Sequence, residues 1–391
     1  MPKEPVPIME DVLMCPGDNK VNCFFKPFVP NTFVVREGST LFVIDTGAGK
    51  SMKEMLQKAV NQLRGDAKKL VLINTHTHID HVGNNKSIMS LEGFDEKHHL
   101  MHEAGEKTLG DPYSYLLNVF RETDRYYDVF EGPPPPWRFF TRLMSIGSRQ
   151  TNLDKLVGSV LKKYDPVESS PETGEFLKRD DMGLIKIGSG NVEELRMSSD
   201  VVSIDLGPRT LKGWTIDEAV IWAEESHSPD HIMILFPGKK LLISGDLTID
   251  LFPTLPNHPK SELAIKNMST IKDLATEEII TTLADSHHNG VCEGMNSINT
   301  FIQGIIDRHK SFRDTLISCF DGESEGETGE TINDLYRKLR KKRFDNRAVD
   351  FHLEQQFPVT PAFLKSIICT ILLEMGCSVE GSGKKARFLK P

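Results

Sequence analysis

The chain has 391 residues, of which 38% are hydrophobic and 26% are charged, and its formal net charge is −9. This composition excludes a disordered chain, the length suffices for two structural units, and the negative charge disfavours a general nucleic-acid binder. No apolar run reaches the roughly 18 residues of a membrane-spanning helix, and the N-terminus lacks the layout of a signal peptide. The six cysteines have no short repeated spacing, so we expect a reduced, cytoplasmic protein.

The N-terminal part alternates strands with helices. Residues 32–36 and 40–44 are apolar runs separated by a glycine-containing turn, which predicts a β-hairpin whose second strand is buried on both faces. Apolar residues three and four positions apart predict a helix over residues 51–64, and residues 70–74 form another apolar run. This alternation predicts an α/β layered fold.

The middle of the chain has a different composition. Residues 95–200 lack a clear strand pattern, and nine of the 28 residues at positions 113–140 are aromatic, against 8% of the whole chain. Four consecutive prolines begin at Pro133 within this stretch. We therefore expect residues 95–200 to be an inserted cap, mostly helical in its aromatic part and with loop toward its end. Its aromatic side chains either pack the cap or line an apolar pocket.

Strand patterns return further along the chain, at residues 201–204, 232–236, 240–244 and 278–285. A Pro-Gly-Lys turn joins the second and third of these and predicts another hairpin. An amphipathic pattern predicts a helix over residues 261–275. These strands and this helix extend the layered α/β arrangement.

The last part of the chain has its own pattern. It predicts helices at residues 309–320, 331–343 and 361–375, followed by a small hairpin near the C-terminus. Three helices and a terminal hairpin are the outline of a winged helix. We therefore expect a larger unit at residues 1–304 and a winged-helix-like unit at residues 305–391.

The candidate chemistry directly follows the apolar run at residues 70–74. His76, His78, Asp80 and His81 occupy four of six consecutive positions there. Because side chains two residues apart point the same way in an extended chain, His76 and His78 can approach one ion. A catalytic zinc keeps an open coordination position, so four ligands fit two neighbouring ions better than one. The alternative is a hydrogen-bonded, histidine-rich turn without a metal.

The sequence His76-x-His78-x-Asp80-His81 after a buried strand resembles the signature of the metallo-β-lactamase superfamily. Residues 45–47, Asp-Thr-Gly, also resemble the end of the first hairpin of that family. The resemblance extends over about residues 20–300.

Three later residues stand where the family has its remaining metal ligands. His227 lies in a Ser-His-Ser-Pro stretch, although serine and aspartate replace the glycines that usually flank this histidine. Asp246 lies in a Gly-Asp step after the second hairpin. For the last ligand, His287 and His288 are both available at the end of a late strand, and we favour His287.

The resemblance implies a four-layer αβ/βα sandwich with two divalent metal ions at the sheet edges. It assigns the first ion to His76, His78 and His227, the second ion to Asp80, His81 and His287, and the bridging position to Asp246. A mixed set of histidine and carboxylate ligands suits zinc, manganese or iron better than calcium or magnesium, and zinc is our first expectation.

Two such ions lower the pKa of a shared water, and the bridging hydroxide can attack a carbonyl or phosphoryl centre near neutral pH. The ions also stabilise the oxyanion that develops, and we expect Asp80 to orient the nucleophile or to pass a proton to the leaving group. The sequence therefore predicts a metal-dependent hydrolase. Because the aromatic cap suits a bulky, partly apolar small molecule, we expect an ester-type bond, either a thioester or a lactone.

Two other classes of function stay open. A nuclease of the same superfamily would need a basic groove, which the net charge of −9 disfavours. An iron-dependent oxidoreductase or a non-catalytic metal-binding protein is the other alternative, but non-hydrolytic members often replace the second histidine of the motif, and His78 is a histidine. We expect neither a membrane nor a nucleic-acid partner, and we leave a homodimer open.

Other histidines lie outside the motif. We expect His231 to be a packed or solvated histidine, with a contact to the metal ligands as the alternative. The pattern of His98, His99 and His102 favours a group of surface histidines.

Overall fold

The computed structural model describes residues 4–17, 29–111, 114, 168–178, 181–185, 187–188, 191–192, 204–205, 210–248, 261–287, 290–320, 329–342, 359–381 and 386–389. The expected strand at 201–203, the aromatic stretch at 113–140 apart from residue 114, and the second candidate His288 lie outside these residues.

The first sheet has seven strands that follow one another in sequence order. They are β1 (Val6–Met9), β2 (Val12–Cys15), β3 (Thr32–Glu37), β4 (Thr40–Ile44), β5 (Lys69–Ile73), β6 (Glu96–His102) and β7 (Glu175–Leu177). Strands β1 to β4 are antiparallel, and β4 to β7 are parallel. The predicted first hairpin is confirmed as β3–β4, and the predicted helix is α1 (Lys50–Arg64), which connects β4 with β5.

The second sheet follows the order β11 to β17, with β8 paired to β12. Its strands are β8 (Gly183–Ile185), β11 (Ile204–Asp205), β12 (Thr210–Ile216), β13 (Ala219–Ala223), β14 (Ile232–Phe236), β15 (Leu241–Ile243), β16 (Thr282–Ala284) and β17 (Val291–Glu293). The predicted hairpin of β14 and β15 is confirmed, with a 3₁₀ turn at Pro237–Lys239. Helix α8 (Ser261–Thr276) matches the predicted helix and leads to β16, which is parallel to β15.

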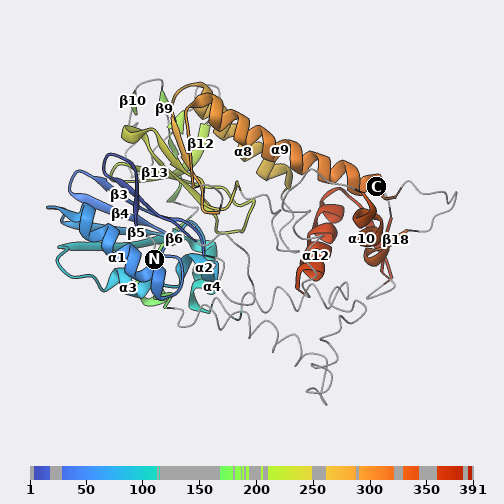
Figure 1. Ribbon diagram of the computed structural model, residues 1–391, viewed down its shortest axis with the longest axis horizontal. Helices are drawn as coiled ribbons and strands as arrows, with labels where there is room; N and C mark the ends of the chain where they lie inside the picture. The colour runs from blue at the N-terminus through green and yellow to red at the C-terminus, as the bar shows by residue number, and fades with distance from the viewer. Residues whose placement is uncertain are drawn as a thin grey trace, which may run out of the picture.

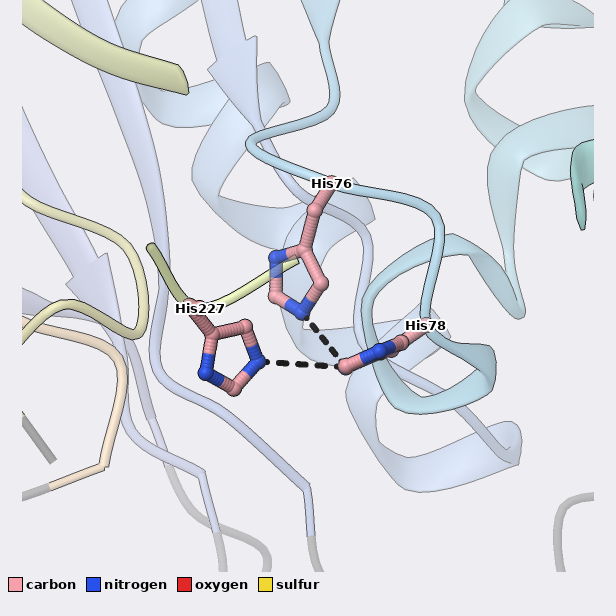
Figure 2. Close-up of side chains that lie close together, drawn as sticks. All are labelled: His76, His78 and His227. Atoms are coloured by element: carbon pink, nitrogen blue, oxygen red, sulfur yellow. Dashed lines mark hydrogen bonds between the residues drawn. The ribbon is translucent and has the colours of Figure 1, made fainter. Parts of the chain in front are cut away.

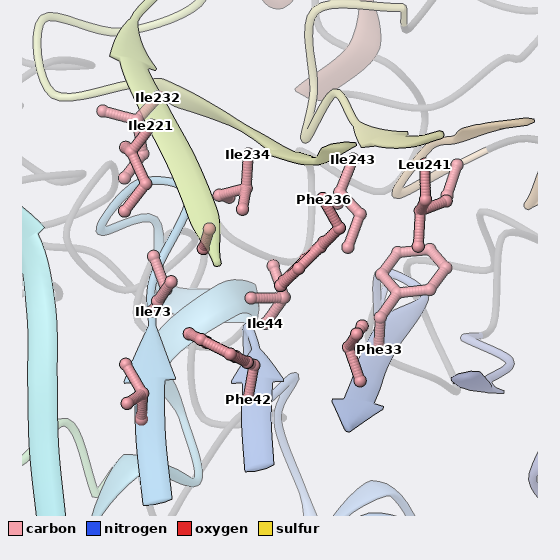
Figure 3. Close-up of a cluster of buried hydrophobic side chains, with 14 of the residues drawn as sticks. Phe33, Phe42, Ile44, Ile73, Ile221, Ile232, Ile234, Phe236, Leu241 and Ile243 are labelled. Atoms are coloured by element: carbon pink, nitrogen blue, oxygen red, sulfur yellow. The ribbon is translucent and has the colours of Figure 1, made fainter. Parts of the chain in front are cut away.

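The two sheets pack face to face around one apolar interior. Alternate side chains of each strand meet there: Phe42 and Ile44 of β4 and Ile73 of β5 contact a layer formed by Ile234 and Phe236 of β14 (Figure 3). The opposite face of the first sheet packs against α1 and α3 (Asn85–Met89), and that of the second sheet packs against α8 and α9 (Met295–Ile317). The order helix, sheet, sheet, helix is the four-layer αβ/βα sandwich that the resemblance implied.

One expectation about the middle of the chain is wrong. Residues 95–200 were expected to lack clear strands, yet β6 is an inner strand of the first sheet and β7 is its edge. The pattern of β6 is hard to recognise because His99 and His102 occupy buried positions and look polar in the sequence. The stretch expected to be an inserted cap thus contains β6, β7 and the short pair of β9 (Ile187–Gly188) with β10 (Asn191–Val192), and the insertion itself stays a prediction.

The C-terminal part has the predicted elements, but its first helix is much longer than expected. Helix α9 runs from the second sheet to α10 (Ile332–Lys341) and α12 (Val359–Glu374) (Figure 1). Three short strands complete this part: β18 (Glu330–Thr331), β19 (Ser378–Glu380) and β20 (Arg387–Leu389). The expected boundary at residues 304 and 305 falls inside α9, and the winged-helix assignment stays a prediction.

The composition predicted no membrane-spanning helix and no disulfide framework, and the described residues bear on both. None of the described helices has the length and apolarity needed to cross a membrane. Five cysteines are described, and each of them is a free thiol.

Because the two sheets share one apolar interior, removing an aromatic ring from its centre should strongly reduce the stability of the protein. Phe42 and Phe236 come from opposite sheets, are 0% exposed, and have ring centroids 5.2 Å apart in an edge-to-face arrangement. We expect Phe236→Ala to lower the free energy of unfolding by about 3–5 kcal/mol, as measured by equilibrium denaturant unfolding. Val6→Ala, at a position that is 41% exposed, is the control. A loss as small as that of the control would contradict the placement of Phe236 in the core.

Candidate metal centre

The structure brings all seven predicted site residues together at one edge of the two sheets. The contributing segments are the loop after β5 with His76 and His78, α2 (Ile79–Val82) with Asp80 and His81, the loop between β13 and β14 with His227, the turn after β15 with Asp246, and the turn after β16 with His287. Each residue therefore follows a strand that belongs to the packed core. The rigid sheets fix the positions of these short segments.

Three histidines form the first group. The Nε2 atom of His76 lies 2.9 Å from Nδ1 of His78, and Nε2 of His227 lies 3.2 Å from the same Nδ1 (Figure 2). His76 is 0% exposed and His227 is 5% exposed. Three imidazole nitrogens thus converge on one point, as the ligands of a metal ion do.

The second group lies beside the first. His81 and His287 each have their Nε2 atom 3.8 Å from Oδ2 of Asp80. Asp80 is the more accessible member, because its side chain is 15% exposed while that of His81 is fully buried.

Asp246 lies between the two groups. Its Oδ2 atom is 3.5 Å from Nε2 of His227 and 3.8 Å from Nε2 of His76 on one side, and 3.2 Å from Nε2 of His287 on the other. Its Oδ1 atom is 3.3 Å from Nε2 of His81. The carboxylate therefore has the position expected for a bridge between two ions.

The hydrogen bonds behind the site fix which nitrogen of two histidines carries the proton. Asp45 Oδ2 accepts a hydrogen bond from the Thr75 hydroxyl (2.7 Å) and lies 2.8 Å from His81 Nδ1. Nδ1 of His81 therefore carries a proton, and Nε2 is the nitrogen that faces the site. Because the Thr75 hydroxyl donates to Asp45, it accepts from His76 Nδ1 at 3.1 Å, which frees Nε2 of His76 in the same way.

A second carboxylate connects the loops that carry the histidines. Asp230 Oδ2 accepts hydrogen bonds from the backbone N–H and the hydroxyl of Thr77, at 2.8 and 2.5 Å. Asp230 Oδ1 accepts from the Ser228 hydroxyl at 2.7 Å. The loop after β5 and the loop after β13 are thereby held against each other, although they belong to different sheets.

The electrostatic surroundings suit metal ligands. Burial holds the pKa of His76 and His227 well below its usual value and lowers the pKa of His78, so these rings are neutral and can bind a cation. Burial alone would raise the pKa of Asp246, but His287 and His81 hold it well below its usual value. Burial also acts to lower the pKa of His81, yet Asp246 and Asp45 outweigh it and hold that pKa well above its usual value.

The residues fit two divalent ions. Three sets of ligand atoms each lie within 4.8 Å of one another: His76, His78 and His227; His76, His81 and Asp246; and Asp80, His81 and His287. Among the described residues, buried Nε2 of His81 and Oδ1 of Asp246 have no hydrogen-bond partner. Buried polar atoms without partners are costly, and coordination of a cation would satisfy both. Neutral imidazoles with carboxylates are the donors that zinc, manganese and iron prefer.

Several residues that organise the site were missed by the sequence reasoning. The Asp45-Thr46-Gly47 stretch was noted for its resemblance, but the contact of Asp45 with His81 was not foreseen. Asp45 has a φ of 58°, an unusual conformation for a residue with a side chain, and this is the local sign of its special role. Asp230 and Glu224 were not singled out, since an acidic residue in a loop gives no sequence signal of burial.

The other histidines differ from one another. His98 is at the surface with a 29% exposed side chain, but the surface assignment is wrong for His99 and His102, which are 0% and 1% exposed. His231 is 0% exposed, and its Nε2 accepts the backbone N–H of Asp246, so the alternative of a contact to the candidate ligands is the one found.

Comparisons with known proteins agree with this geometry. Residues 25–281, more than half of the chain, match the sequence profile of the metallo-beta-lactamase superfamily, so the chain belongs to that superfamily. It matches no curated protein sequence.

Solved structures show the same fold at low sequence identity. A beta-lactamase domain protein from Burkholderia ambifaria has a TM-score of 0.55 and 13% identity, over 98% of this chain and 94% of that chain. A metallo-beta-lactamase family protein from Thermus thermophilus has a TM-score of 0.52 and 13% identity, over 98% of this chain and 100% of that chain. A stereoselective inverting sec-alkylsulfatase from Pseudomonas sp. has a TM-score of 0.52 and 13% identity, over 93% of this chain and 49% of that chain.

A buried network beneath the site yields a prediction about pH. His99 Nε2 lies 2.8 Å from Asn74 Oδ1, and His99 Nδ1 lies 2.9 Å from the Thr173 hydroxyl. Burial lowers the pKa of His99 from 6.5 to about 4, and Glu172 opposes this shift only in part. The unfolded chain therefore binds a proton at higher pH than the folded protein.

The contribution of neutral His99 to the free energy of unfolding is complete above pH 6.5 and falls by about 3 kcal/mol as the pH decreases to about 4. His99→Gln removes this titration, and we expect a shallower loss of stability between these pH values than in the wild type. Denaturant unfolding at a series of pH values measures both slopes. Equal slopes for the two proteins would contradict the prediction.

Proposed function

We propose that this protein is a metal-dependent hydrolase that uses two divalent metal ions, and zinc is the metal that we expect first. The observation that carries the proposal is the position of Asp246. Its carboxylate faces nitrogens of His227 and His76 on one side and of His287 and His81 on the other, at 3.2 to 3.8 Å.

A single ion does not account for this arrangement. Seven side chains converge, whereas a catalytic zinc uses about three protein ligands and keeps one position open. The three ligand sets overlap at His76 and His81, as expected when neighbouring ions share one carboxylate. Two ions therefore use the donors better than one.

Two ions at this position would lower the pKa of a water and stabilise the negative charge of the transition state. The side chains of the site would bind the ions and move the proton. Asp246 and the buried histidines would hold the ions, and the partly exposed Asp80 could orient the nucleophile or transfer a proton to the leaving group. Its position beside His81 and His287 supports this assignment.

The proposed substrate is a bulky, partly apolar small molecule with an ester-type bond, a thioester or a lactone. The density of aromatic residues at 113–140 supports this choice of substrate, and the histidine at position 78 supports hydrolysis over redox chemistry. The sulfatase relative is 13% identical and about twice as long as the matched region, so it supports the fold and leaves the substrate open.

The proposal is tested first by the metal content of protein purified without chelators, measured by mass spectrometry. We expect close to two zinc or manganese ions per chain. We expect His78→Ala and Asp246→Ala to lose metal and to abolish hydrolysis in a screen of thioesters and lactones, while the circular dichroism spectrum stays unchanged.

His98→Ala is the matched control, because His98 is a histidine of β6 whose ring contacts Glu96 and Glu175 and none of the seven site residues. It should keep both the metal and the activity. A protein that holds mostly iron would instead support redox chemistry. A protein that takes up almost no metal after reloading with zinc or iron, or full activity in both site variants, would contradict the proposed mechanism.

A further inference from the structure

The loop between β13 and β14 closes around a buried carboxylate, that of Glu224. Its Oε2 atom accepts hydrogen bonds from the backbone N–H groups of Ser226 (3.0 Å) and His227 (3.2 Å). Its Oε1 atom accepts a hydrogen bond from Nδ2 of Asn267 in α8 at 2.9 Å and contacts the Ser226 hydroxyl. The side chain of Glu224 is 0% exposed, so one buried carboxylate fixes the backbone of a residue of the first histidine group.

The same carboxylate reaches the bridging aspartate through His231. His231 Nδ1 lies 2.8 Å from Glu224 Oε2, and His231 Nε2 accepts the backbone N–H of Asp246 at 3.0 Å. Because Nε2 is the acceptor, the ring proton is on Nδ1, the nitrogen beside the carboxylate. Both side chains are fully buried. A continuous set of contacts thus leads from His227 to Asp246 without passing through a metal.

The backbone beside Asp246 is shaped around the His231 ring. Gly245 has a φ of +54°, and a Cβ atom at this position would lie 2.4 Å from His231 Nε2. A residue with a side chain would therefore displace the ring or the turn. The glycine allows the turn after β15 to approach His231 closely enough for the hydrogen bond to form.

We propose that Glu224 and His231 are a positioning pair that holds Asp246 at a fixed place relative to His227 and thereby sets the affinity of the site for both ions. This inference rests on the proposed two-metal function. His227 belongs to the first histidine group, whereas Asp246 faces both groups. Loss of the pair therefore weakens the binding of both ions together, which distinguishes it from the loss of a ligand of one ion.

Variants at His231 separate positioning from packing. His231→Phe keeps a ring of similar size but removes the acceptor for the Asp246 N–H and the nitrogen that lies 2.8 Å from Glu224. His231→Gln keeps one acceptor and one donor. We expect His231→Phe to lower the zinc affinity of both sites by roughly 10–100-fold, in the range found for residues that orient metal ligands, and His231→Gln to restore most of it.

Zinc affinity is measured by competition with a chromophoric chelator on the full-length protein, and thermal melting of the zinc-free protein reports the fold. The matched control is His309→Phe, the same change at another histidine, 1% exposed and located in α9 on the outer face of the second sheet. It should leave the zinc affinity unchanged. Glu224→Gln is the second variant and decides the question if His231→Phe does not fold.

The outcomes separate this inference from the proposed function. A wild type that binds zinc at both sites, together with a weakened His231→Phe and a recovered His231→Gln, supports the positioning pair. A wild type that binds zinc while His231→Phe and Glu224→Gln bind it equally well overturns the pair and leaves the proposed function standing. A wild type that binds no zinc and no other divalent ion overturns both.

Discussion

The site depends on the packing of two sheets around one apolar interior. Because Phe42, Ile73 and their neighbours in the first sheet contact Ile234 and Phe236 in the second, the two sheets have a fixed relative position. The loops that follow β5, β13, β15 and β16 therefore meet at one edge. A backbone hydrogen bond from Ile232 N–H to the Thr75 carbonyl, at 2.8 Å, joins the two sheets directly at this edge. Candidate ligands that are up to 211 positions apart, from 76 to 287, are brought together in this way.

Such a site requires charged groups inside the protein, which is costly unless each charge is paired and hydrogen-bonded. Three buried carboxylates outside the seven site residues meet this condition: Asp45, Glu224 and Asp230 each accept at least three hydrogen bonds from their own loops and from other segments. The contacts of Asp45 also orient two histidine rings, because they turn Nε2 of His76 and of His81 toward the site.

The sequence predicts the parts of this molecule that are governed by local patterns. Strands β4 and β5 are continuous apolar runs because both of their faces are buried, one against the second sheet and one against α1. His76, His78, Asp80 and His81 are recognisable because they lie within six positions of one another, and His227, Asp246 and His287 follow from the resemblance. The seven residues converge in space, while their roles as ligands stay a prediction.

The parts that were missed depend on contacts between distant segments. Strand β6 was not recognised because His99, which appears polar, is satisfied by Asn74 of the neighbouring loop and by Thr173 far along the chain. The hairpin of β12 and β13 was missed because Gly213 interrupts its apolar pattern. Glu224 and Asp45 are single acidic residues in the sequence, and only the folded structure shows which backbone groups and rings they hold.

The helix that crosses the expected domain boundary has a structural consequence. Ile298, Ile302 and Ile305 of α9 pack on the second sheet, whereas Phe312 and Leu316 of the same helix pack in the C-terminal core. A rigid helix that serves two cores fixes their relative orientation.

Polar contacts reinforce this connection at the start of α8. Glu374, at the end of α12, accepts a hydrogen bond from the Glu262 backbone N–H at 2.9 Å, and Arg313 of α9 binds the Glu262 carboxylate at 2.9 Å. Helix α8 also carries Asn267, which donates a hydrogen bond to Glu224. The C-terminal part is therefore connected, through one helix, to the carboxylate that contacts the backbone of His227.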